Sequence, residues 1–401
     1  MVSLQDIQKA QSTLRGVSVV TPLDRSRTLS ELTRNEVYLK LENLQRTGSF
    51  KIRGAYNRLA NLPEDARAHG VIAASAGNHA QGVAEAARML NMPCTIVMPA
   101  AASLSKVQAT RGYGAKVVLF GDSYDDAFIH ATQLRDADGA TLIHAFDDEQ
   151  IIAGQGTIGL EILEALPDVD AVLVPVGGGG LVAGVATAIK ALRPEVAVYG
   201  VQAAGAASFR ASFEQHALTA LEHVATIADG IAVKRPGKIT WDIARRWLED
   251  ILVVEEEEIA RAMVFLLERM KVLCEGAGAA AVAALLADRF PLTGSRIAVI
   301  LSGGNVDMSL LSRLIEHGLA AAGRRARIVT VLVDRPGALS RLLRTVADSG
   351  ANITSVEHHR FTRSLIIGQV EVQLEVETRD LEHLAHLCDQ FSQAGYTFEI
   401  D

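Results

Sequence analysis

From about residue 70 to residue 305, short β-branched runs alternate with longer segments of helical periodicity. This alternation predicts parallel strands joined by helices that cover both faces of the sheet. The expected strands are 71–75, 95–99, 116–120, 141–145, 171–176, 197–202, 251–254 and 297–302, and the expected helices include 79–90, 104–111, 122–136, 155–166, 181–191 and 256–270. Such sheets bind ligands at the carboxyl ends of their strands, so the turns after the strands are where we look for chemistry.

The pattern changes after residue 320. Residues 320–325 have no apolar periodicity and are interpreted as a linker. Beyond them the expected order is strand 327–333, helix 337–349, strands 353–360 and 366–376, helix 380–394 and strand 396–400. This βαββαβ order is that of the ferredoxin-like unit. We therefore divide the chain into an α/β region at 1–320, a linker at 321–326 and a small domain at 327–401.

Composition excludes several classes of protein. With 49% hydrophobic and 21% charged residues, the 401-residue chain can bury large cores, which excludes disorder and collagen-like repetition. The formal charge of −8 gives no overall field that would attract nucleic acid or a membrane. Three widely separated cysteines without a CxxC pair indicate reduced thiols in the cytoplasm, and the scattered histidines show no metal-ligand spacing. The first residues do not resemble a signal peptide, and the apolar stretch 276–287 predicts a buried helix too short to span a bilayer.

Lys51 stands between Phe50 and Ile52 at the start of a predicted helix. Burying an unpaired ammonium is costly. Desolvation lowers the pKa of a lysine, which makes it a usable nucleophile or Schiff-base former. The alternative is a surface lysine whose stem packs against its helix. Taken alone, this segment favours the surface lysine.

The strand expected at 71–75 runs into a turn of small residues, Ser75-Ala76-Gly77-Asn78-His79. Backbone N–H groups would be free where this turn opens a helix, and such a place favours an anion such as a carboxylate. Asn78 adds a side-chain amide to the same crevice. An ordinary capped turn with a structural His79 is the alternative.

A run of four glycines, Gly177–Gly180, joins an apolar strand to a helix. It is better explained as a phosphate-binding loop than as a flexible linker, although it matches neither the dinucleotide-binding pattern nor the P-loop. Ser302 ends the last strand of the region and either caps a helix or faces a heterocycle that needs a neutral hydrogen-bond partner. Glu275, an acid in apolar and Gly-rich surroundings, needs a partner.

Together, these segments resemble the fold-type-II pyridoxal-phosphate enzymes (the tryptophan synthase β-like fold) and, within them, the threonine dehydratase and serine racemase family. The resemblance covers about residues 5–320 and rests on the segments 48–55, 75–82, 177–181 and 302–305. Cysteine synthases usually carry Asn-Thr-Gly where this chain has Asn78-His79-Ala80-Gln81-Gly82, so the resemblance favours elimination over replacement. It implies pyridoxal 5′-phosphate as cofactor, a small subdomain inserted at about 47–145, and conversion of L-threonine to 2-oxobutanoate and ammonia, with activity on L-serine as well.

The resemblance also implies roles for single residues. Lys51 would hold the cofactor and remove the Cα proton, and Ser75 would stand on the opposite face, where a racemase reprotonates. The cofactor would bind to Lys51, Phe50, Asn78 (ring oxygen), Gly177, Gly178, Gly179, Gly180 and Leu181 (phosphate) and Ser302 (pyridine nitrogen). The substrate carboxylate would bind at Ser75, Ala76, Gly77, Asn78 and His79. A hydroxyl partner does not stabilise a protonated pyridine, so Ser302 would leave a weaker electron sink and favour loss of the β-hydroxyl over transamination.

The segment Asp334-Arg335-Pro336-Gly337-Ala338-Leu339 resembles part of an ACT regulatory domain. This implies that residues 327–401 regulate the enzyme. A small amino acid would bind near Asp334, Pro336, Gly337, Ala338 and Leu339, often between paired domains. Isoleucine as inhibitor and valine as its antagonist are the pair that the resemblance suggests. A homo-oligomer, either dimer or tetramer, is therefore expected.

Three other functions remain open, namely dehydration of serine or hydroxyaspartate, racemisation, and amino-acid sensing without catalysis. The presence of Lys51 and Gly177–Gly180 argues against a sensor. Many family relatives have a cation site with an acid shortly after the strand that follows the phosphate-loop helix, and this chain has Gln202 there. Because hard divalent cations favour carboxylate oxygens, no tight Mg²⁺ or Ca²⁺ site is expected.

Overall fold

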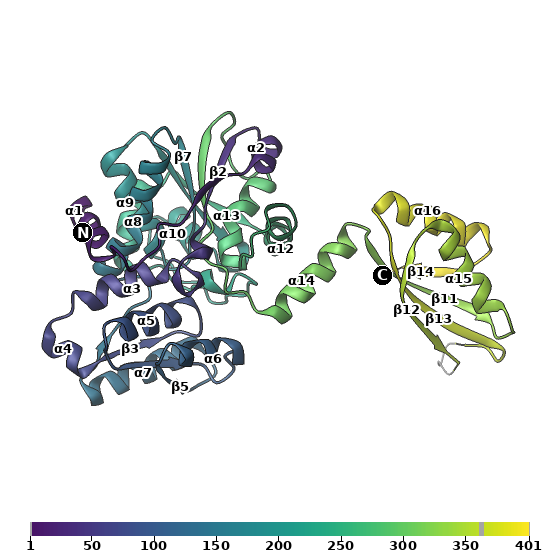
Figure 1. Ribbon diagram of the computed structural model, residues 1–401, viewed down its shortest axis with the longest axis horizontal. Coiled ribbons are helices and arrows are strands. Elements are labelled where there is room, and N and C mark those ends of the chain that lie inside the picture. Colours follow the sequence, from purple (N-terminus) through teal and green to yellow (C-terminus); the bar gives the residue numbers. More distant parts are fainter. Residues whose placement is uncertain (1, 361–364, 401) are drawn as a thin grey trace. The chain divides into compact units, whose positions relative to one another are not determined.

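The computed structural model describes residues 2–360 and 365–400. The chain divides into two compact units, Met1–Asp307 and Met308–Asp401 (Figure 1). In the described part of the chain, no helix combines the length and the apolar character needed to cross a membrane.

The larger sheet of the first unit has six strands in the order β1-β2-β10-β7-β8-β9. Its strands are β1 (Leu23–Arg25), β2 (Glu36–Lys40), β7 (Ala171–Pro175), β8 (Ala197–Ala203), β9 (Asp250–Val254) and β10 (Arg296–Ile300). All neighbours pair in parallel except β1, which runs antiparallel to β2. The central strand β7 is buried along its whole length, as a parallel strand covered on both faces must be, which explains its continuous apolar run.

Helices cover both faces of this sheet (Figure 1). On one face, α8 (Glu149–Ala165) and α9 (Gly180–Leu192) pack Ile158 and Val182 against Val174 of β7. The two helices approach closely where a Cβ on Gly184 would clash with the backbone of α8. On the other face lies α13 (Gly276–Leu286), the buried helix expected from the sequence, in contact with β7, β8, β9 and β10.

The smaller sheet of the first unit has the order β5-β4-β3-β6, with all pairs parallel. Its strands are β3 (Val71–Ala74), β4 (Cys94–Met98), β5 (Lys116–Leu119) and β6 (Thr141–Leu142). Because side chains alternate along a strand, Val71 and Ala73 pack with α3 (Lys51–Ala60) and α5 (Asn78–Met89). Ile72 and Ala74 instead pack with α7 (Tyr124–Asp138) on the opposite face.

The remaining helices of this unit are α1 (Leu4–Thr13), α2 (Arg27–Thr33), α4 (Glu64–His69), α6 (Leu104–Gly112), α10 (Ser208–Glu214), α11 (Lys238–Trp247) and α12 (Glu256–Phe265). In this unit, three expected boundaries differ most from the structure. The helix expected at 155–166 begins earlier because Asp148 caps the N–H groups of Gln150 and Ile151. The helix expected at 256–270 changes to a π-turn at Leu266. The strand expected at 141–145 stops at Leu142, before a loop bonded to His144.

The second unit contains α14 (Met308–Ala321), β11 (Arg325–Val333), α15 (Ala338–Ser349), β12 (Asn352–His359), β13 (Gln369–Glu377), α16 (Leu381–Gln393) and β14 (Phe398–Ile400). The sheet order is β12-β13-β11-β14, and all its pairs are antiparallel. Alternate residues of β11 and β13, among them Ile328 and Leu374, pack under Leu342 of α15 and Phe391 of α16. This is the expected ferredoxin-like arrangement.

The linker expected at 321–326 is shorter in the structure. Ala321 ends α14 and Arg325 begins β11, so residues 322–324 alone join them. The alanines at 320–322 favour helix, and Gly323 ends it with a φ of +63°, a left-handed conformation that suits glycine.

Candidate active site

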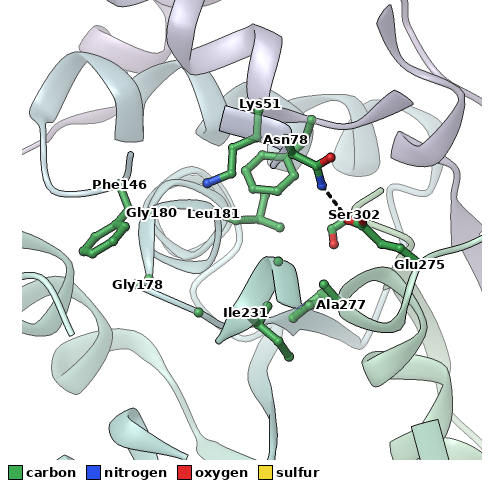
Figure 2. A pocket seen from close by; sticks show the side chains of 15 residues that line it. Lys51, Asn78, Phe146, Gly178, Gly180, Leu181, Ile231, Glu275, Ala277 and Ser302 are labelled. Atoms are coloured by element: carbon green, nitrogen blue, oxygen red, sulfur yellow. Dashed lines mark hydrogen bonds between the residues drawn. The ribbon is translucent and has the colours of Figure 1, made fainter. Parts of the chain in front are cut away.

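Turns from distant parts of the first unit line one pocket (Figure 2). The lining includes Lys51 at the start of α3, Asn78 at the start of α5, Gly177–Gly180 between β7 and α9, and Ser302 after β10. Figure 2 shows Gly178 and Gly180 on one side of the pocket and Ser302 with Glu275 on the other. The structure thus brings the motifs selected from the sequence into one place.

Lys51 lies inside this pocket, so the surface-lysine interpretation was wrong. Its Nζ donates a hydrogen bond to the carbonyl oxygen of Ala145 at 3.2 Å. The chain before it is held in place because the Phe50 N–H donates to the carbonyl of Ser302 at 3.2 Å. Burial lowers the pKa of Lys51 to about 8, although the Glu275 carboxylate opposes that shift.

The loop Gly177–Gly180 is packed too tightly to be a flexible linker. A Cβ on Gly178 would clash with the ring of Phe146, and one on Gly179 would clash with Phe209. The Gly178 carbonyl accepts a hydrogen bond from the Thr240 hydroxyl at 2.7 Å. No side chain caps α9, which begins at Gly180. The first N–H groups of α9 therefore remain available to an anion such as phosphate.

Asn78 is held by side-chain bonds on both sides. Its Nδ2 donates to Oε1 of Glu275 at 2.5 Å, and its Oδ1 accepts from Nδ2 of Asn305 at 2.8 Å. Burial and the Asp229 carboxylate raise the pKa of Glu275 to about 7, against the opposing effects of Asn78, Lys106 and Lys51. Glu275 therefore has the partner that its surroundings require.

The turn Ser75–His79 lines a larger cavity, of about 920 Å³, that shares Lys51 and Asn78 with the first pocket. Gly77 precedes α5 and no side chain caps this helix, so its first N–H groups are available to a carboxylate. His79 is buried and its Nε2 bonds the Ile143 carbonyl at 3.1 Å. Burial and the nearby Lys51 ammonium lower the pKa of His79 to about 3, so its ring is neutral at pH 7.

Comparison with known families identifies this arrangement. Residues 15–303 match the family described as "Pyridoxal-phosphate dependent enzyme", and residues 326–385 match the ACT domain. The chain belongs to the pyridoxal-phosphate dependent enzymes. The expected fold, an α/β fold-type-II enzyme with a C-terminal ACT domain, is confirmed.

Three proteins illustrate where this pyridoxal-phosphate enzyme lies within its family. It is 49% identical over 400 residues to L-threonine ammonia-lyase of Thermotoga maritima, and the match covers 100% of both chains. The processed form of threonine deaminase isoform 2 from Solanum lycopersicum is 40% identical, with a TM-score of 0.75 and coverage of 78% of this chain and 86% of that one. Maize serine racemase is 34% identical, with a TM-score of 0.76 and coverage of 80% and 98%.

The pocket fits the cofactor of this family in chemistry. The glycine loop lines the pocket, and the uncapped N-terminus of α9 that follows it suits a phosphate. At the other side, Ser302 and Asn78 present neutral polar groups suited to a heterocycle, and Lys51 presents an amine. The assignment of Lys51, Phe50, Asn78, Gly177–Leu181 and Ser302 to the cofactor remains a proposal.

The structure adds residues of this enzyme to which the sequence analysis gave no role. Phe146 covers the glycine loop, Ala145 binds Lys51, and His144 lines the larger cavity. All follow β6, so the rule that ligands gather after parallel strands points to them once the end of β6 is placed correctly. Asn305 was already present in the Ser302 motif, but its contact with Asn78 depends on the fold.

In the ACT domain of the enzyme, the expected effector residues form the turn between β11 and α15. Asp334 pairs with Arg360 at 2.9 Å, and this bond lowers the pKa of the Asp334 carboxyl. Pro336 is followed by Gly337, whose φ is +84°, and Ala338 begins α15, followed by Leu339. Effector binding at this turn stays a prediction.

Gln202 lies buried at the end of β8 with its amide fully engaged. Its Nε2 donates to the carbonyls of Val176 and Ala206, both at 3.2 Å, and its Oε1 accepts from the Arg210 N–H at 3.0 Å. Among the described residues, no three His, Cys, Asp or Glu side chains are grouped so as to hold a metal ion.

Proposed function

We propose that this enzyme converts L-threonine to 2-oxobutanoate and ammonia and also acts on L-serine. The observation that carries the proposal is the likeness, along the whole chain, to L-threonine ammonia-lyase of Thermotoga maritima. The site supports it, because Lys51, Gly178 of the glycine loop and the Ser75–His79 turn line the same cavity.

Pyridoxal phosphate, when bound, supplies an electron sink for the bonds at Cα of an amino acid joined to it. The glycine loop and the N-terminus of α9 hold the phosphate, and the amide of Asn78 and the hydroxyl of Ser302 orient the ring. Because Ser302 is neutral and buried, it would not hold an extra proton on the ring, which would favour loss of the β-hydroxyl.

Lys51 is the group that moves the Cα proton of the substrate. Its pKa of about 8 leaves a useful fraction of neutral amine near pH 7, so its Nζ can take the proton from Cα. The N–H groups at the start of α5 bind the substrate carboxylate and orient Cα towards Lys51. The Lys51 ammonium can return this proton to the β-hydroxyl, which would leave Cβ as water, and the enamine, once released, hydrolyses through its imine to the 2-oxo acid and ammonia.

Racemisation of serine is the second candidate, favoured by the likeness to maize serine racemase and by the place of Ser75 on the cavity wall. Incubation of the purified protein with L-threonine, L-serine and 3-hydroxyaspartate distinguishes the candidates. We expect equal amounts of 2-oxobutanoate and ammonia from L-threonine. D-Serine without 2-oxo acid would indicate a racemase, and a protein with neither turnover nor a visible cofactor band would be a sensor.

We further propose that the ACT domain binds a small amino acid, with isoleucine inhibiting and valine opposing it, and that the enzyme forms a homodimer or homotetramer. The ACT match supports an amino-acid effector. Free thiols at Cys94, Cys274 and Cys388 suit a reducing compartment, so we place the enzyme in the cytoplasm.

A further inference from the structure

His144 has a fixed arrangement of its ring proton. Its Nδ1 accepts hydrogen bonds from the backbone N–H groups of Phe146 at 3.2 Å and Asp147 at 2.8 Å. A ring nitrogen that accepts carries no proton, so the proton of the neutral ring lies on Nε2. Burial lowers the pKa of His144, with Lys51 acting in the same direction and Asp147 and Asp148 against it. The ring is therefore a neutral donor through Nε2–H near pH 7.

This donor reaches the larger cavity. His144 lines the cavity beside Lys51 and the Ser75–His79 turn. No described residue forms a hydrogen bond with its Nε2. This nitrogen is also absent from the buried polar atoms that lack a partner, so it is accessible, and the cavity is the space that the His144 side chain lines. His79 differs, because its Nε2 is already bonded to the Ile143 carbonyl.

Two aromatic rings pack against His144. The ring of Phe146 meets His144 edge to face with centroids 4.7 Å apart, and that of Phe128 does so at 6.4 Å. Both rings line the same cavity, together with Tyr124. A small apolar group such as a methyl fits this wall, and His144 places one hydrogen-bond donor within it.

The polar groups of the substrate can be matched to the cavity one by one. The amino group reacts where Lys51 lies, and the carboxylate has the N–H groups of α5. The β-hydroxyl has no partner in either place. His144 directly precedes Ala145, whose carbonyl holds Nζ of Lys51 at 3.2 Å, and the His144 side chain lines the same cavity as Lys51 and is close enough for the Lys51 charge to lower its pKa.

We propose that His144 determines specificity by donating its Nε2–H to the β-hydroxyl oxygen of a 2-amino-3-hydroxy acid. This inference rests on the proposed function, because it concerns the substrate of that same site. An amino acid without the hydroxyl leaves the Nε2–H without a partner in the occupied cavity, which weakens its binding relative to L-threonine.

The test compares two ligands of equal carbon skeleton in the holoenzyme, namely the KM for L-threonine and the inhibition constant of L-2-aminobutanoate. His144→Asn keeps an acceptor for the N–H groups of Phe146 and Asp147 but is too short to place a donor in the cavity. We expect KM for L-threonine to rise about tenfold, while the inhibition constant of L-2-aminobutanoate does not rise. His130→Asn, outside the cavity in the same subdomain, should change neither constant.

If both constants rise equally, His144 acts on the carboxylate or on the loop and not on the hydroxyl. If neither constant changes, His144 contacts neither ligand. Either result overturns the proposal. If His144→Asn loses the visible cofactor band, His144→Gln takes its place, since its amide N–H reaches further. For His144→Gln we expect the ratio of the KM for L-threonine to the inhibition constant of L-2-aminobutanoate to stay within about threefold of the wild-type ratio. A larger rise in this ratio overturns the proposal. Wild-type enzyme that forms no 2-oxobutanoate refutes the proposed function, whereas active wild type with an unchanged ratio in the variant refutes His144 alone.

Discussion

At the scale of single residues, the surroundings of Lys51 explain why a lysine can act as a base near neutral pH. Burial disfavours the ammonium, and the Ala145 carbonyl and the Glu275 carboxylate only partly compensate. An exposed lysine would stay almost fully charged at pH 7. The reactivity of Lys51 therefore comes from its place in the pocket.

Lys51→Ala should lose the visible cofactor band and lower turnover of L-threonine at least about 100-fold, because no other group would carry the Cα proton. Absorbance and 2-oxobutanoate release measure the two effects. Lys116→Ala, on an exposed position of β5, is the matched control and should behave as wild type. Turnover close to wild type in Lys51→Ala would remove the lysine from its proposed role.

Glu275 makes stability depend on pH. Its pKa is raised to about 7 in the folded protein from 4.5, so between these values the folded state keeps a proton that the unfolded chain has lost. The contribution of Glu275 to the free energy of unfolding is fully present at low pH and decreases as the pH rises towards 7. In cofactor-free protein, Glu275→Gln should therefore gain roughly 2–3 kcal/mol in free energy of unfolding, relative to wild type, between pH 5 and pH 7.5.

Urea unfolding at several pH values measures this difference. Glu64→Gln, on the exposed first turn of α4, is the control, because Glu64 lies outside the pocket. A difference between wild type and Glu275→Gln that stays constant with pH would contradict the raised pKa of Glu275.

Gln202 bears on metal dependence. Its amide already bonds the Val176 and Ala206 carbonyls and the Arg210 N–H, so it offers no free oxygen, and a neutral amide is a poorer ligand than the carboxylate that hard cations prefer. We expect treatment with a chelator to leave turnover of L-threonine within about twofold of the untreated enzyme. A strong loss of activity that Mg²⁺ restores would contradict this prediction.

At the scale of elements, α3 is held by buried charges. Arg53, two residues after Lys51, is fully buried and bonds both oxygens of Glu42 at 2.8 and 2.9 Å and Glu161 of α8 at 2.6 Å. Lys40 of β2 completes the cluster by bonding Glu161 at 2.6 Å. Two positive and two negative groups thus join α3 to β2 and α8, and they fix the helix that presents Lys51.

Arg53→Ala should lower the free energy of unfolding by about 3–5 kcal/mol, because it leaves buried carboxylates without their partner. Arg27→Ala removes an exposed ion pair with Glu31 and should cost far less. Urea unfolding of both variants measures the contrast. Similar small losses in the two variants would mean that the buried cluster adds little to stability.

At the scale of the whole molecule, the catalytic groups and the expected effector turn lie in different compact units. Every residue proposed for the cofactor precedes Asp307, and the first unit has its own cores. A chain cut after Ala322 should therefore keep the cofactor and the reaction but lose any response to isoleucine or valine. An effector can act only by binding one state better than another, with a coupling of typically about 1–3 kcal/mol.

Dose–response curves of the full chain and the shortened chain, with each amino acid added to the L-threonine assay, measure that loss. Asp334→Asn in the full chain is the milder variant, since it weakens the Arg360 pair at the expected turn without removing the domain. A shortened enzyme that isoleucine still inhibits would place the regulatory site in the first unit.

The sequence by itself determined the fold class and the motifs. Strand and helix periods are local properties, so the alternation at 70–305 predicts the parallel sheets, and the βαββαβ order after it predicts the ferredoxin-like unit. The sequence also singled out three places next to predicted elements, namely the glycine run between a strand and a helix, Lys51 at the start of a helix and Ser302 at the end of a strand. The ends of the helices were harder to predict, because single residues decide them. Asp148 caps the start of α8, and Gly323, in a left-handed conformation, ends α14.

Only the tertiary structure decided which of these groups meet. β10 lies between β2 and β7, so the end of β10 brings Ser302 to the start of α3, although about 250 residues separate them in the chain. The partners of Asn78 and the carbonyl that binds Lys51 also come from segments far away in the chain. Strand order is set by the packing of whole helices and strands, and no local period in the sequence records it.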